Sequence, residues 1–185
     1  MRVLLIAVTL LMFTASCKSK KSKSQKAANE VTEESLTNIP DPKSEGAAWI
    51  KDMKKELSDS LFLRLKRTAC FGRCPIYTLS IYIDGTVVYE GEKWVEREGN
   101  YNSRVNQTVL EQIQNKADSI EFKLLDEVYD NLNVTDLPAT ITVLKDEEDF
   151  KVVVNRYGAP EKLNHFEDFI DKMVKNLDWE KIEEQ

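Results

Sequence analysis

The chain has 185 residues, enough for one domain with an extension, because domains usually contain about 100–200 residues. Its hydrophobic fraction of 42% and charged fraction of 31% are ordinary for a globular protein, which excludes wholesale disorder, collagen and a multi-span membrane protein. With 26 basic and 32 acidic residues the net charge is -6, which argues against a general affinity for nucleic acid.

Residues 1–16 have the pattern of a secretory signal peptide. A positive start at Arg2 is followed by an apolar or neutral run over 3–13, which is much shorter than the roughly 20 residues that a membrane span needs. Small residues at 14–16 stand directly before Cys17. This arrangement resembles the lipobox of bacterial lipoproteins, and its relaxed form is similar to that of Bacteroidetes. The alternative is ordinary secretion with cleavage near Ser16.

The lipobox resemblance implies that the leader is removed and that Cys17 is acylated. Two or more acyl chains hold a protein stably on a bilayer, so we expect a membrane-anchored envelope protein, on the outer membrane and facing the periplasm. Residues 17–43 are predicted to be a flexible basic linker, which either attracts anionic head groups or acts only as a solvated spacer. Arg2 and five lysines precede residue 29, which leaves 20 basic against 32 acidic residues over 29–185, a net charge of about -12.

Residues 44–185 are predicted to form one α+β domain. Alternating apolar residues, turn signals and helical stripes predict its first half. The expected elements are a short helix from Ser44 with Trp49, Ile50, Met53 and Leu57 on one stripe, a strand over 61–67, and a hairpin of 77–83 and 86–89 around Asp84-Gly85.

The second half follows the same rules. The expected elements are a helix capped by Asn106, a short helix carrying Leu124, Leu125, Val128 and Tyr129, a hairpin of 139–145 and 150–156, and a last helix with Pro160 at its first position. The order is strand-strand-strand-helix-helix-strand-strand-helix. We therefore predict a two-layer sandwich in which the helices cover one face of a mostly antiparallel sheet of about five strands.

Three short motifs identify a family. They are Ala69-Cys70-Phe71-Gly72-Arg73-Cys74-Pro75 with Tyr77, then Asp84-Gly85-Thr86-Val87 with Tyr89, and then Thr135-Asp136-Leu137-Pro138. Together they resemble the uncharacterised bacterial family catalogued as domain of unknown function 6438, whose members are often lipoproteins. The resemblance covers residues 58–178 and implies no activity.

Cys70 and Cys74 are the two cysteines that remain if Cys17 is lipidated. An even number of cysteines in an exported protein favours a disulfide, and Gly72 and Pro75 suit the tight loop that this pairing needs. A thiol-redox role is the alternative, because Arg73 lies between the cysteines and favours a thiolate. A metal site is a weaker interpretation, since His165 is the only histidine and is expected on a helix surface. We predict no metal and no cofactor.

No catalytic constellation stands out in the sequence, and we assign no catalytic residue. Aromatic residues concentrate in and near the first hairpin, and an exposed aromatic face binds proteins or glycans such as peptidoglycan, although helices could equally cover it. Asp136 is the one acidic residue singled out, and a turn or cap role explains it equally well. The candidate binding residues are Arg73, Tyr77, Tyr82, Tyr89, Trp94, Tyr101 and Asp136. The favoured function is a non-enzymatic binding or scaffold module with an envelope protein or glycan partner.

Overall fold

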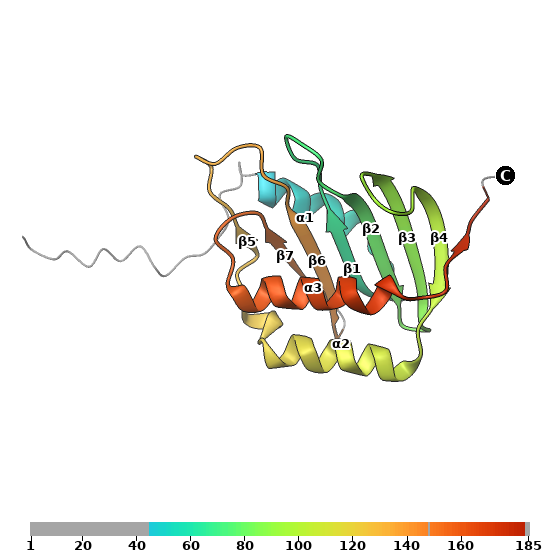
Figure 1. The fold of residues 1–185 in the computed structure, drawn as a ribbon. Coiled ribbons are helices and arrows are strands. Elements are labelled where there is room, and N and C mark those ends of the chain that lie inside the picture. Colours follow the sequence, from blue (N-terminus) through green and yellow to red (C-terminus); the bar gives the residue numbers. More distant parts are fainter. Residues whose placement is uncertain (1–44, 148, 184–185) are drawn as a thin grey trace, which may run out of the picture. The chain divides into compact units, whose positions relative to one another are not determined.

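The computed structural model describes residues 45–147 and 149–183, and Figure 1 shows their fold. The predicted signal peptide, Cys17 and the linker over 17–43 lie outside these residues. Within the described ranges, no helix is long and apolar enough to cross a bilayer.

Three α-helices, one 3-10 turn and eight strands make up the domain. In chain order they are α1 (Glu45–Lys55), β1 (Leu61–Arg67), β2 (Ile76–Tyr82), β3 (Thr86–Lys93), β4 (Gly99–Arg104), α2 (Gln107–Ser119), η1 (Phe122–Leu124), β5 (Val128–Tyr129), β6 (Thr140–Asp146), β7 (Asp149–Asn155), α3 (Glu161–Lys175) and β8 (Glu180–Lys181). The predicted α+β class is confirmed.

All eight strands belong to one open sheet with the order β5-β7-β6-β1-β2-β3-β4-β8. Every neighbouring pair is antiparallel except β5 and β7, which run parallel. The expected five strands were too few. The sequence interpretation missed β4, a polar strand with little alternation, and the two-residue strands β5 and β8 at the sheet edges.

The helices cover both faces of the sheet, so the predicted two-layer arrangement is wrong. Figure 1 shows α2 and α3 in front of the sheet and α1 behind it. Ile50 and Met53 of α1 pack with Ile141, Val143 and other apolar residues on the rear of β6 and β7. Strands buried on both faces have continuous apolar runs instead of alternation, and this pattern is present in β6 and β7.

The front core contains the largest buried side chains. Phe122 and Phe166 contact each other with ring centroids 5.5 Å apart, between the α2–η1 segment and α3. Asn106 caps α2 as predicted, because its side chain accepts a hydrogen bond of 3.1 Å from the Val109 amide.

Two predicted helical features differ in the structure. The short helix expected around Leu124 is only a 3-10 turn, because Glu121 adopts a left-handed conformation with φ 56° and Leu125 then returns to an extended one. The chain continues into β5 beside β7. Pro160 is the N-cap residue of α3, one position before the first helical residue. The apolar side chains of α3 form one stripe, in which Leu163, Phe166, Ile170 and Val174 are buried.

Candidate ligand-binding pocket

A hydrogen-bond network joins three neighbouring strands to α3. Arg67 at the end of β1 lies directly opposite Tyr77 on β2 and Thr140 on β6. Its Nε donates to the Tyr77 hydroxyl over 2.9 Å, Nη1 donates to Thr140 Oγ1 over 3.0 Å, and Nη2 donates to Asp171 Oδ2 over 2.6 Å. The Tyr77 hydroxyl in turn donates to Asp171 Oδ1. The network fixes the end of α3 over the sheet.

The pKa of Tyr77 reflects this environment. Burial, and then the adjacent Asp171 carboxylate, raise the pKa of Tyr77 far above its ordinary value. The hydroxyl therefore stays protonated and acts as a donor. Asp171 has its negative charge balanced by Arg67, so the network presents no uncompensated charge to its surroundings.

Aromatic rings from three parts of the chain meet beside this network. Tyr77 and Tyr89 on neighbouring strands stack with centroids 5.3 Å apart, and Tyr89 meets Trp179 at 5.6 Å. The Trp179 indole Nε1 donates to the Val174 carbonyl over 3.3 Å, which holds the ring against the end of α3. Burial raises the pKa of Tyr89 to about 12.

These rings form one wall of a cavity of about 450 Å³, which we call the aromatic pocket. This volume lies in the range of small-molecule sites, roughly 300–1,000 Å³. Its lining residues are Pro75, Tyr77, Tyr89, Trp94, Val95, Glu96, Arg97, Asp171, Val174, Lys175 and Trp179.

The connection between β3 and β4 supplies the other wall of the aromatic pocket. Trp94 adopts a left-handed conformation with φ 59°, and 45% of its surface is exposed. Gly91 allows the tight return of the chain, because a Cβ at this position would stand 1.9 Å from the Arg97 carbonyl oxygen. Arg97 lies 3.6 Å from the Glu96 carboxylate, forming an ion pair at the pocket.

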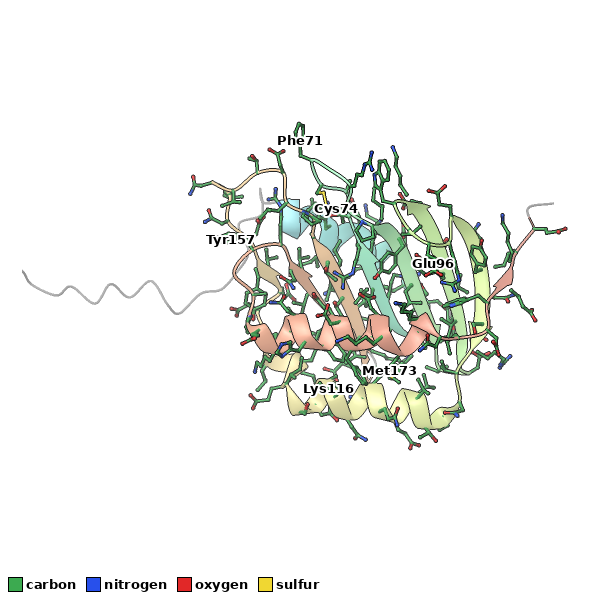
Figure 2. The ribbon with its side chains drawn as sticks, in the orientation of Figure 1. Phe71, Cys74, Glu96, Lys116, Tyr157 and Met173 are labelled. Atoms are coloured by element: carbon green, nitrogen blue, oxygen red, sulfur yellow. A yellow bond between two sulfur atoms is a disulfide. The ribbon has the colours of Figure 1, made fainter. Side chains whose placement is uncertain are left out.

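The disulfide loop between β1 and β2 lies at the same end of the sheet. Cys70 and Cys74 are at disulfide distance, with Cα atoms 5.8 Å apart. Figure 2 shows Cys74 at the base of the loop and Phe71 at its tip, where the Phe71 side chain points away from the sheet. The loop also carries Arg73, whose guanidinium carbon lies 5.1 Å from the centre of the Trp94 ring. It therefore contacts the wall of the aromatic pocket.

A second cavity, of about 740 Å³, lies between α1 and the other side of the disulfide loop; we call it the α1 cavity. Cys70 and Asp136 are among its lining residues. Asp136 has φ 67°, and its carbonyl accepts a hydrogen bond of 3.3 Å from the Phe71 amide. The backbone of Asp136 thus holds the 130–139 segment against the disulfide loop, while its side chain accepts a hydrogen bond of 3.1 Å from Thr135 Oγ1.

The candidate binding residues separate into distinct places. Tyr77, Tyr89 and Trp94 meet in the aromatic pocket, and Arg73 covers Trp94. Tyr82 lies on the opposite face among the residues that pack with α1. Two further candidates lie apart from this pocket. Tyr101 is on β4, where it pairs with Tyr89 of β3, and Asp136 lines the α1 cavity.

Several residues of the site were missed by the sequence interpretation, among them Glu96 and Lys175 on the pocket wall. Arg67 and Asp171 read as ordinary polar ends of a strand and a helix, and only the register of β1, β2 and α3 brings them together. Arg97 and Trp179 lie in segments with no regular pattern. Trp179, beyond the last apolar stripe, is the one whose residue type carried a usable signal.

His165 lies on the surface of α3, where its side chain is 64% exposed and stands 3.5 Å from Glu161. Among residues 45–147 and 149–183, no group of three or more histidine, cysteine or acidic side chains is arranged to hold a metal ion.

Comparison with known proteins gives one match. A family model described as "Domain of unknown function (DUF6438)" matches residues 61–174, well over half of the chain. The matched range contains the disulfide loop, the Arg67–Tyr77–Asp171 network and most of the aromatic pocket, but not Lys175 or Trp179. No curated protein and no solved structure matches the chain.

Proposed function

The chain belongs to the DUF6438 family, and because this family brings no assigned activity we propose a function from the aromatic pocket: a non-enzymatic, lipid-anchored envelope module that binds a partner there. The observation that carries the proposal is the meeting of Tyr77, Tyr89, Trp94 and Trp179 around one cavity of about 450 Å³. Aromatic side chains are enriched at binding sites because they offer large contact areas at a low cost in conformational entropy.

The surroundings of the pocket support binding over simple packing. Trp94 keeps 45% of its surface exposed, whereas Tyr77 is buried and Tyr89 and Trp179 are partly buried. The hydrogen bonds of Arg67 hold Tyr77 and Asp171 in place before any ligand arrives. A preorganised site of this kind loses less entropy on binding.

The proposed anchor rests on residues 1–17, with the signal-like leader and Cys17. Acylation of Cys17 would tether the domain in the envelope. The preferred position of the domain is on the outer membrane, facing the periplasm. The linker over 17–43 would let the pocket reach a partner tens of ångströms from the bilayer, on the order of 5–6 Å times the square root of its length.

Site-specific photocrosslinking tests the binding proposal. We would place a benzoylphenylalanine at Glu96 on the pocket wall, and at the exposed His165 as the matched control, in the full chain in its native envelope. We expect an adduct from position 96 that is absent from position 165 and lost when Trp179→Ala is added. If position 96 gives no adduct, or gives one that is indifferent to Trp179→Ala, the pocket is not a binding site.

A thiol-redox role for Cys70 and Cys74 is the second candidate. Both cysteines are partly exposed, and Cys70 lines the α1 cavity, so a partner thiolate has access to the pair. This function would place the chemistry in the α1 cavity and leave the aromatic pocket without a role. The redox titration described below distinguishes the two proposals.

A further inference from the structure

Besides Arg97, three cationic side chains gather at the aromatic pocket. Lys175 lines it, and Arg73 and Lys93 lie 5.1 Å and 5.4 Å from the centre of the Trp94 ring on its wall. Over the described part of the chain, no carboxylate lies within ion-pair distance of any of the three. The acidic groups nearby are already engaged, since Asp171 pairs with Arg67 and Glu96 pairs with Arg97.

This local excess of positive charge contrasts with the rest of the chain. Residues 29–185 carry a net charge of about -12, so acidic side chains outnumber basic ones on an average part of the surface. Cations that lie together without carboxylates to neutralise them attract anions and raise their local concentration. The charge of the pocket is therefore complementary to a negatively charged ligand.

The side chains that line the aromatic pocket indicate which class of negatively charged ligand fits it. A pyranose ring has C–H-bearing faces that pack on aromatic rings, and hydroxyl groups around its edge. Tyr89 and Trp179 offer such rings at an interplanar angle of 56°, and Glu96 and Arg97 stand at the pocket to exchange hydrogen bonds with hydroxyl groups. A flat ring with polar edges fits this combination.

An extended peptide fits less well. Peptides that add to a sheet need a free strand edge for backbone hydrogen bonds. The outer edge of β4, the strand next to the pocket, is already paired with β8 at Tyr101 and Asn102. The aromatic pocket itself is lined by side chains from β2, β3, the β3–β4 connection and α3, together with Pro75 before β2 and Trp179 after α3.

We infer that the ligand of the aromatic pocket is a sugar carrying a carboxylate, a uronic acid or a muramic acid unit of an envelope glycan. The sugar ring packs against Tyr89 and Trp179, and Lys175 binds the carboxylate. The positive charges of Arg73 and Lys93 attract the same carboxylate. The inference rests on the proposed function and specifies its ligand.

Matched pairs of sugars test the inference. We would titrate the full chain in detergent with oligosaccharides of galacturonic, glucuronic, mannuronic and muramic acid, each beside its methyl ester, and follow binding by calorimetry. We expect at least one acid to bind at least about tenfold more tightly than its ester, the size of effect given by a charge-assisted hydrogen bond. Its affinity should fall as salt rises from about 50 to about 200 mM.

Two lysines of α3 provide the variant and its control. Lys175→Gln should weaken binding of the acid by about tenfold and leave binding of the ester unchanged. Lys172→Gln, three residues earlier on the same helix and also exposed, should change neither. Equal weakening by both variants would contradict a specific role for Lys175.

The outcomes separate this inference from the proposed function. If an ester binds as well as its acid, the pocket binds sugars without using its charge, and only the inference fails. If no acid binds better than its ester while position 96 still gives its crosslink, the ligand is of another class and the binding function stands. If both experiments are negative, both proposals are wrong.

Discussion

The Tyr77 hydroxyl on β2 donates a hydrogen bond of 2.5 Å to Asp171 on α3, 94 residues later in the chain. Arg67 bonds to both residues, so a strand pair and the last helix share one polar network beside the aromatic pocket. The network links the packing of α3 to the geometry of the pocket wall.

The first prediction concerns the charge of Asp171. Asp171→Asn keeps the shape of the side chain but leaves the largely buried Arg67 without its main counter-charge. We expect a loss of about 2–3 kcal/mol in the free energy of unfolding, measured by urea denaturation. Asp168→Asn is the matched control, because Asp168 is 61% exposed and stands 4.0 Å from Arg67. Equal losses in the two variants would show that the network does not depend on Asp171.

The second prediction concerns Glu167, one turn before Asp171 on α3. Its side chain is buried, with hydrogen bonds from Asn155 Nδ2 at 2.8 Å and Thr142 Oγ1 at 3.3 Å. Burial outweighs these bonds and raises the pKa of Glu167 to about 7, from an ordinary 4.5. The folded state therefore holds this proton more tightly than the unfolded state does. Its contribution to stability is greatest below pH 4.5 and falls as the pH rises to about 7.

Glu167→Gln removes this titration. We expect the variant to be more stable than the parent at pH 8, by up to about 3 kcal/mol, and to have nearly the same stability at pH 4. Urea denaturation across this range measures both values. Glu161→Gln, at a side chain 84% exposed, should show no such pH dependence. A variant that is destabilised equally at both pH values would refute a proton-linked role for Glu167.

The third prediction distinguishes a structural disulfide from a redox centre. Cys70 and Cys74 are four residues apart, and closing so short a loop contributes about 2 kcal/mol. We expect thiol trapping on protein taken directly from cells to find the pair oxidised, with a reduction potential below about -300 mV. A potential between about -120 and -270 mV, where catalytic dithiols lie, would instead favour the redox function.

The fourth prediction concerns the anchor. Cys17→Ala should abolish labelling by palmitate and move the chain from the membrane fraction to the soluble fraction, because in the proposed lipoprotein the acyl chains supply the membrane affinity. Ser19→Ala, two residues later, should change neither result. Membrane association and labelling that survive Cys17→Ala would exclude acylation at this cysteine.

The sequence pattern was sufficient where side chains alternate or form stripes. The strand over 61–67, the hairpin at Asp84-Gly85 and helices α2 and α3 follow directly from apolar periodicity and turn residues. The second layer of helix was missed for a physical reason. The apolar runs in β6 and β7 indicate that both faces of these strands are buried. Of the described helices, only α1, through its apolar stripe, covers the second face of the sheet.

The site was less accessible from sequence than the fold. Tyr77, Tyr89 and Trp94 could be selected as aromatic residues near one hairpin, and they do meet in the aromatic pocket. Residue type alone does not distinguish Tyr82 from these three residues. The alternation of side chains along β2 places Tyr82 on the face opposite to Tyr77. The contact of Asp171 with Arg67 depends on where α3 crosses the sheet, and no local pattern contains that information.

Chemical-shift mapping tests the central claim, that the aromatic pocket is the binding site, most directly. The full chain in detergent micelles would be titrated with solubilised glycan from a bacterial envelope. We predict shifts confined to Tyr77, Tyr89, residues 94–97 and the end of α3 with Trp179, and none at Trp49 or Leu137 in the α1 cavity. Shifts centred on the α1 cavity, or no shift at the aromatic pocket, would contradict the account.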